Sequence, residues 1–164
     1  MCIRDSIGFI EENNFSNVSI IQKALVGDNQ QDCVLTEFVG EKKQDGTNRY
    51  HQWNNVLGNH KHKMKDRNDV ELIEYQVETM TIEDIFKIDG IDEIDYFKMD
   101  IEGSEYEVID SLTQELATKI KQISMELHDN SKNAALEQKL KDLGYSTKVF
   151  EHNELYAYRR STDK

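Results

Sequence analysis

Residues Tyr96–Glu105 read YFKMDIEGSE, an apolar run followed by an acidic cluster around one glycine. Ser104 and Glu107 have the spacing of a capping box, so a helix is predicted to begin directly after the turn. In open α/β sheets, ligands bind at the carboxyl ends of strands, where such a unit places its turn. The stretch therefore predicts a strand, a turn and a helix, with a candidate site at the turn.

The hydrophobic pattern that continues from Ile94 alternates between strand and helix. Four strands are expected, at Ile94–Met99, Gln122–Leu127, Tyr145–Phe150 and Leu155–Tyr158. The two helices between them carry apolar stripes made by Val108, Ile109, Leu112 and Leu116, and by Leu136, Leu140 and Leu143. Asn130 or Ser131 is expected to cap the second helix, and Gly144 to end it. This order predicts an α/β fold with a mainly parallel sheet and an antiparallel C-terminal strand.

The pattern before Ile94 is less regular. It predicts the end of a helix at Ile7–Phe15, a short strand at Val18–Ile21 that is closed by Ala24-Leu25, and a helix opened by the capping box of Thr81 and Asp84. Strands at Cys33–Val39 and Val70–Thr79 are expected to pair antiparallel. Between them, Gly40–Asp69 is interpreted as a long exposed loop, whose histidines His51, His60 and His62 form either a solvated patch or a lid.

Two further features of the sequence concern the origin of its first residues and the location of the protein in the cell. Residues Met1–Ser6 read like the translated end of a sequencing adapter and are interpreted as an artefact, with an ordinary N-terminal segment as the alternative. Neither a secretion signal nor an apolar run of about 20 residues is apparent. Cys2 and Cys33 lack metal or disulfide spacing, so a cytoplasmic protein with reduced thiols, not bound to a membrane, is expected.

The size and charge limit the class of protein further. The chain has 164 residues, which suits one domain with a real core, and a formal net charge of −12. Nucleic-acid binding is not expected, because it normally requires a basic surface.

Polar residues at two strand ends are the candidates for chemistry. Asp100 and Glu102 flank the turn at Gly103, where a carboxylate can hold a cationic ligand or accept a proton. Glu126 and His128 lie two residues apart at the end of the next strand, so their side chains point the same way. If the two strands are neighbours, the pair comes near Asp100 and can act as base and orienter or coordinate a metal. Acidic residues in a helix's first turn also serve its dipole, which is the interpretation preferred for Glu105 and Glu107.

Four pieces of the chain, in order, resemble the FkbM family of S-adenosylmethionine-dependent methyltransferases. They are NFSNVSIIQKALVGD, VETMTIEDIF, IDYFKMDIEGSEYEVIDSL, and ISMELHD with LGYST and LYAYRR. The resemblance implies a Rossmann-like sheet of order 3-2-1-4-5-7-6 and methyl transfer to an oxygen of a small molecule or sugar. It places Ala24 and Leu25 near the adenine of S-adenosylmethionine. It also places Asp100, Glu102 and Gly103 on the donor and substrate side, with Asp100, Glu126 and His128 catalytic and no metal.

The chain departs from the family pattern in its first part. No glycine-rich loop follows a strand, and no second strand ends in a ribose-binding acidic residue. We therefore expect an incomplete sheet that lacks its first two strands, and a fragment that is inactive alone. The unpaired edge left on the strand at Ile94–Met99 would make self-association possible.

Two other functions remain open from the residues themselves. One is a metal-dependent hydrolase, in which Asp100, Glu102, Glu126 and His128 ligate a hard cation. The other is a non-catalytic α/β interaction module.

Overall fold

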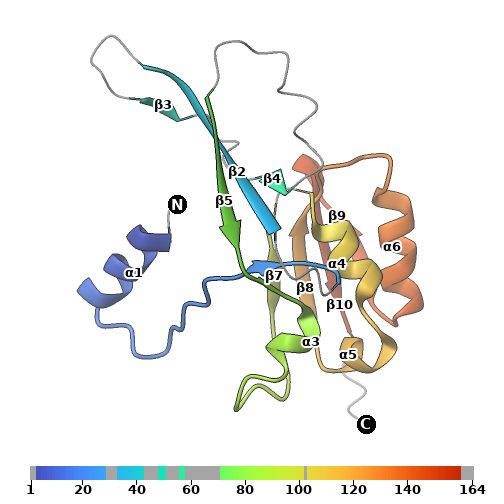
Figure 1. Ribbon diagram of the computed structural model, residues 1–164. Coiled ribbons are helices and arrows are strands. Elements are labelled where there is room, and N and C mark those ends of the chain that lie inside the picture. The colour runs from blue at the N-terminus through green and yellow to red at the C-terminus, as the bar shows by residue number, and fades with distance from the viewer. Residues whose placement is uncertain are drawn as a thin grey trace.

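The computed structural model describes residues 3–28, 33–42, 48–50, 56–57, 71–101 and 103–159 (Figure 1). No helix in these ranges is long and apolar enough to span a bilayer. The fold is of the mixed α/β type, with parallel and antiparallel strand pairs.

The C-terminal half of the chain forms a four-stranded sheet. Its order is β7 (Phe97–Met99), β8 (Gln122–Glu126), β10 (Glu154–Tyr158) and β9 (Ser146–Val149). β7 and β8 are parallel, whereas β10 is antiparallel to both of its neighbours, so β7, β8 and β9 share one direction. The predicted mainly parallel arrangement with a reversed C-terminal strand is therefore confirmed for this sheet. β7 is shorter than predicted, since Ile94 forms only an isolated bridge with Ile120.

Helices cover this sheet, as the alternating pattern predicts. The one helix expected to carry the stripe from Val108 to Leu116 is divided in two, because Leu112 has extended dihedral angles. They are α4 (Glu105–Ser111), α5 (Gln114–Thr118) and α6 (Asn133–Asp142), and α6 packs on both α4 and β9 (Figure 1). The core is one cluster, to which the strands give Ile123, Met125 and Leu155, and the helices give Val108, Ile109, Leu136 and Leu140. Because Met125 and Leu127 face this core, the alternation along the chain turns Glu126 and His128 away from it.

The end of α6 follows the sequence prediction, but its start does not. Gly144 has φ 89°, and the N–H groups of Gly144 and Tyr145 donate to the carbonyls of Lys141 and Leu140, which is a Schellman ending. At the start, Lys132 is the N-cap and makes no side-chain cap bond. The prediction of Asn130 or Ser131 is wrong because the Ser131 hydroxyl donates to Asp129 instead.

A second sheet forms around β2 (Cys33–Lys42). β2 pairs antiparallel with β5 (Glu71–Val77), as predicted, and this pair extends away from α4 and α6 in Figure 1. β3 (Asn48–Tyr50) and β4 (Val56–Leu57) also pair with β2. The loop prediction is thus wrong at these strands. Residues His51, His60 and His62, with most of the remaining predicted loop, lie outside the described part of the chain.

The predicted strand at Val18–Ile21 is wrong. Those residues belong to no strand, and both Val18 and Ile21 are exposed. The strand lies slightly later, where β1 (Ala24–Leu25) pairs parallel with β6 (Thr79–Met80). A β-branched run becomes a strand only where a partner and a packing surface exist, and here the partner aligns with the following residues.

Two N-terminal predictions concern helices. Thr81 and Asp84 form the predicted capping box at the start of α3 (Ile82–Ile85). The predicted N-terminal helix is α1 (Ile3–Glu12), which ends three residues before Phe15. Helix α1 begins within Met1–Ser6, the segment interpreted as an adapter remnant. The adapter origin of that segment stays a prediction.

Candidate functional site

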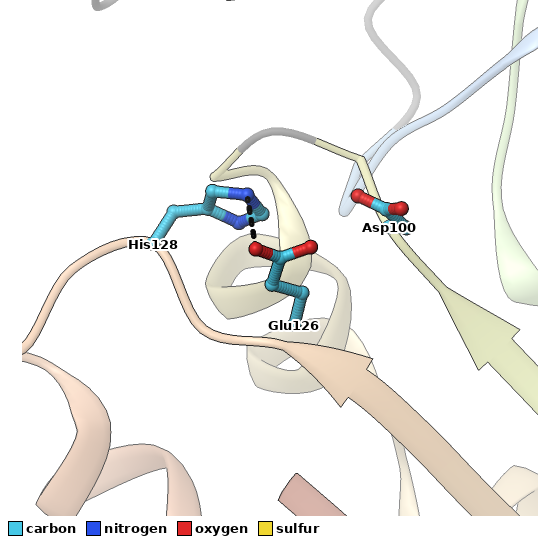
Figure 2. Close-up of side chains that lie close together, drawn as sticks. All are labelled: Asp100, Glu126 and His128. Carbon is cyan, nitrogen blue, oxygen red and sulfur yellow. Dashed lines mark ion pairs between the residues drawn. The ribbon is translucent and has the colours of Figure 1, made fainter. Parts of the chain in front are cut away.

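The carboxyl ends of β7 and β8 bring three of the predicted site residues together. The strands pair in parallel with Met99 opposite Met125, so the residues that follow them emerge at the same edge of the sheet. Asp100 follows β7, Glu126 ends β8, and His128 lies two residues beyond (Figure 2). One ligand atom from each of the three lies within 4.8 Å of the others. The predicted proximity is confirmed, and we call these residues the strand-end cluster.

The strand-end cluster is open on its acidic side. The side chains of Asp100 and Glu126 are 48% and 51% exposed, whereas that of His128 is 16% exposed. Figure 2 shows the imidazole of His128 above the Glu126 carboxylate, with Nε2 of His128 at 4.0 Å from Oε1 of Glu126. On the other side of the ring, Nδ1 of His128 lies 3.2 Å from Oε1 of Glu105. A solute can therefore reach both carboxylates, while the imidazole is held between two acidic groups.

Glu105 is a fully buried carboxylate that holds the turn after β7. Its Oε1 accepts a hydrogen bond from the N–H of Ile101 at 2.9 Å, and its Oε2 accepts one from the N–H of Gly103 at 2.8 Å. Gly103 has φ 104°, a conformation that glycine adopts without steric cost. Glu105 and Glu107 both lie in the first turn of α4, as the dipole interpretation requires, but the hydrogen bonds of Glu105 give it a further role. It is an internal anchor for the turn that carries Asp100.

The predicted capping box at Ser104 does not form. Ser104 is the N-cap of α4, but it has helical dihedral angles and makes no side-chain cap bond. Glu105 reaches back to the turn instead and satisfies backbone donors there. Glu102, which the sequence also assigns to the site, lies outside the described residues.

A signal for the burial of Glu105 was present in the sequence. Glu105 precedes Val108, Ile109 and Leu112 by three, four and seven residues, which puts it on the apolar stripe of the helix. A carboxylate on such a stripe is expected to be buried, and a buried charge requires hydrogen-bond partners. The nearest backbone donors are those of the turn.

Tyr106 fixes the loop that carries His128. Its hydroxyl accepts a hydrogen bond from the N–H of Asp129 at 2.8 Å, and it lies within donating distance of Asn133 Oδ1 at 2.8 Å and of the Asp129 carbonyl at 3.1 Å. Burial of the ring is the main cause that raises the pKa of this hydroxyl, so it stays protonated near neutral pH. Two adjacent residues of α4, Glu105 and Tyr106, thus position both strand ends of the site.

Ala24 and Leu25 lie in β1, outside the strand-end cluster. The residues after them pack against α4, since a Cβ added at Gly27 would come within 2.4 Å of the Glu107 carbonyl oxygen. Val26 is buried, and its N–H donates to the carbonyl of Met80. This segment therefore lies against the helix that begins at the site's turn.

The charges around the strand-end cluster suit a cationic ligand. Two exposed carboxylates face solvent there, and Nζ of Lys98, itself 64% exposed, lies 3.8 Å from Oδ2 of Asp100. The carboxylates of Asp100 and Glu126 fit a positively charged group by simple electrostatic complementarity.

The protein is an α/β domain with acidic groups gathered at the carboxyl ends of adjacent parallel strands, the place where open α/β sheets bind their ligands. Residues 11–147 match the methyltransferase FkbM domain, which is most of the chain. The protein therefore belongs to the FkbM family of methyltransferases. No curated protein and no solved structure matches the chain.

Proposed function

We propose that this protein transfers a methyl group from S-adenosylmethionine to an oxygen of a small molecule or sugar. The observation that carries the proposal is the FkbM match over residues 11–147. The strand order β7-β8-β10-β9 also supports it, because it corresponds to the 4-5-7-6 part of the sheet that the family resemblance implies. The comparisons give no support to a hydrolase or to a non-catalytic module.

In this proposal the methyl donor is held along the edge from β1 to β7. Ala24 and Leu25 would contact its adenine, and Asp100 with Gly103 would line the methyl-donor and substrate side. When bound, S-adenosylmethionine would supply an electrophilic methyl group: the acceptor oxygen would bond to the methyl carbon, and the electron pair of the broken bond would stay on sulfur. Glu102 shares this role by sequence position alone.

The strand-end cluster would prepare the acceptor. An alcohol is a poor nucleophile until its proton is lost, and a carboxylate within hydrogen-bond reach can accept that proton. Glu126 offers an exposed carboxylate for this purpose, and His128, held between Glu126 and Glu105, would orient it. Because Asp100 lies on the neighbouring strand, donor and acceptor would meet over the edge of β7 and β8.

The proposed partners follow from the same charges. A small hydroxylated acceptor can reach the exposed carboxylates, whereas the phosphates of a nucleic acid would be repelled by them and by the net charge of −12. A cytoplasmic location and a capacity for self-association also belong to the proposal.

The proposal is tested with the full-length protein. Calorimetry measures binding of S-adenosylmethionine, and transfer of a labelled methyl group is followed with a panel of hydroxylated small molecules and sugars. Removal of a catalytic base typically lowers turnover by about 10²–10⁴-fold, and we expect Glu126→Gln to do so while donor affinity is kept.

The matched control is Glu115→Gln, which changes an 82% exposed carboxylate on α5 that is not part of the strand-end cluster. It should leave both measurements unchanged. Absence of donor binding by the full-length protein would overturn the proposal, as would unchanged turnover in Glu126→Gln.

A further inference from the structure

We propose that Asp100, Glu126 and His128 form a binding site for a divalent cation of the Mn²⁺ or Mg²⁺ type. The sequence-based assignment for the methyltransferase included no metal. The cation-binding step stands on the geometry of these residues, whereas its role in catalysis rests on the proposed methyl transfer.

The first argument is the spacing of the ligand atoms. Two ligands on opposite sides of such an ion are about 4 Å apart, because each bond is about 2.0–2.1 Å long for Mg²⁺. One oxygen of Asp100, one oxygen of Glu126 and one nitrogen of His128 all lie within 4.8 Å of one another. Small rotations of two half-exposed carboxylates bring the three atoms onto one ion.

The second argument is the support behind the histidine. Histidines that ligate metals commonly have a carboxylate at the other ring nitrogen, which fixes the ring and makes it more basic. Here Nδ1 of His128 is 3.2 Å from the buried carboxylate of Glu105, while Nε2 lies on the side of Glu126. Exposed carboxylates often lie close together without a metal, but an imidazole whose Nδ1 lies 3.2 Å from a fully buried glutamate distinguishes this cluster.

The chemistry of the donor set selects the type of ion. Two carboxylate oxygens favour hard cations such as Mg²⁺ and Mn²⁺, and the imidazole nitrogen shifts the preference toward Mn²⁺. Three protein ligands leave further coordination positions open to solvent, because the carboxylates lie at the exposed side of the site. The positive charge of Lys98, whose Nζ lies 3.8 Å from Oδ2 of Asp100, would repel a bound cation. Its long exposed side chain can move into solvent.

An open position gives the ion a role in the proposed reaction. A hydroxyl oxygen of the acceptor can occupy it, and the positive charge then favours loss of the hydroxyl proton. Each residue contributes one ligand atom, so the second oxygen of Glu126 stays available to accept that proton. The inference thus narrows the acceptor to molecules whose reacting oxygen can approach a bound cation.

The test begins with cation binding in the absence of the methyl donor. The full-length protein is titrated with Mn²⁺, and free Mn²⁺ is measured by electron paramagnetic resonance. We expect one site that Mg²⁺ competes for, and a loss of affinity of about tenfold or more in Asp100→Asn, Glu126→Gln and His128→Gln. Lys98→Met, which removes the opposing charge, should bind Mn²⁺ more tightly.

Two controls keep the result interpretable. Glu115→Gln should bind Mn²⁺ as the wild type does, and thermal denaturation without metal should show that Asp100→Asn and Glu126→Gln remain folded. Absence of Mn²⁺ binding at millimolar concentrations would overturn the inference, and so would equal affinity in the wild type and Glu126→Gln.

The role in catalysis is tested separately. If methyl transfer stops in a chelator and returns with Mn²⁺ or Mg²⁺, the inference is supported. If transfer continues at full rate in the chelator, the catalytic role is overturned while the proposed methyltransferase function stands. If Mn²⁺ binds but S-adenosylmethionine does not, the proposed function fails and the cation site remains.

Discussion

Glu105 is the residue on which the geometry of the site's turn depends. It is fully buried, and both of its oxygens accept backbone hydrogen bonds, one from Ile101 and one from Gly103. An amide at this position would place an N–H₂ group against one of these donors. A buried donor without an acceptor costs roughly 1–3 kcal/mol.

We therefore predict that Glu105→Gln lowers the free energy of unfolding by about 1–3 kcal/mol. The melting temperature should fall by about 2–4 °C for each kcal/mol in a protein of this size, as measured by circular dichroism. Glu107→Gln, at an exposed position of the same helix, is the control and should change stability by less than about 0.5 kcal/mol. Equal losses in both variants would contradict the anchoring role of Glu105.

Tyr106 has the corresponding role at the second strand end. Tyr106→Phe removes a hydroxyl that bonds the backbone N–H of Asp129, and it should cost about 1 kcal/mol. The amide hydrogen of Asp129 should also exchange faster in the variant, which NMR can measure. Tyr96→Phe, which alters a 53% exposed ring, should change neither quantity. An unchanged exchange rate in Tyr106→Phe would show that this hydroxyl does not hold the loop.

At the scale of an element, α3 owes its start to a reciprocal cap. The N–H and hydroxyl of Thr81 both donate to Asp84 Oδ2 at 2.9 Å, and Nζ of Lys87 donates to Asp84 Oδ1 at 2.9 Å. These hydrogen bonds, above all the one from the Thr81 backbone, lower the pKa of Asp84 from 3.8 to about 2. The ionised carboxylate is therefore part of the cap.

This shift has a direct consequence for acid stability. The unfolded chain takes up a proton at Asp84 near pH 3.8, whereas the folded protein holds it ionised down to about pH 2. The stabilisation is complete above pH 3.8 and is lost as the pH falls toward 2. We predict that the difference in unfolding free energy between wild type and Asp84→Asn is largest at neutral pH and shrinks between pH 4 and pH 2.

Denaturant titrations at several pH values measure that difference. Glu83→Gln, which removes a carboxylate at an exposed neighbouring position outside the cap, provides the comparison. A wild-type advantage over Asp84→Asn that stays constant from pH 6 to pH 2 would contradict the prediction.

At the scale of the whole molecule, the N-terminal part packs on helix α4 of the C-terminal half through a close backbone contact. Gly27 approaches the start of α4 so closely that a Cβ would meet the carbonyl oxygen of Glu107 at 2.4 Å and its carbonyl carbon at 2.6 Å. Both are backbone atoms of a helix and cannot move aside easily. The contact links β1 to the helix that positions the site.

We predict that Gly27→Ala destabilises the protein by about 1–3 kcal/mol, because the added methyl group forces the two segments apart. Gly8→Ala is the matched control, since nothing lies within 4 Å of a Cβ there and α1 is helical at that position. That change should be neutral or stabilising by up to about 1 kcal/mol. Denaturant titrations measure the free energy of unfolding of both variants. Equal values for Gly27→Ala and the wild type would contradict the close approach of Gly27 to α4.

Local patterns in the sequence determined the elements of the C-terminal half. The alternation of apolar residues predicted β8, and apolar stripes predicted helices where α4 and α6 lie. Gly144 predicted the end of α6. These features depend on a few neighbouring residues, so they can be read along the chain. The closeness of Asp100 to Glu126 and His128 was predictable for the same reason, once two consecutive strands were taken as parallel neighbours.

Only the tertiary structure decided where short segments with competing partners would bond. Val18–Ile21 has strand propensity, yet the pairing with β6 falls on Ala24–Leu25, because strand pairing is a contact between distant residues. Ser104 has the sequence of a cap, yet Glu105 bonds the turn, because burial on the apolar face requires its carboxylate to find donors. Its burial also brings the Glu105 carboxylate to 3.2 Å from Nδ1 of His128. This contact joins residues 23 positions apart, so only the tertiary structure shows it.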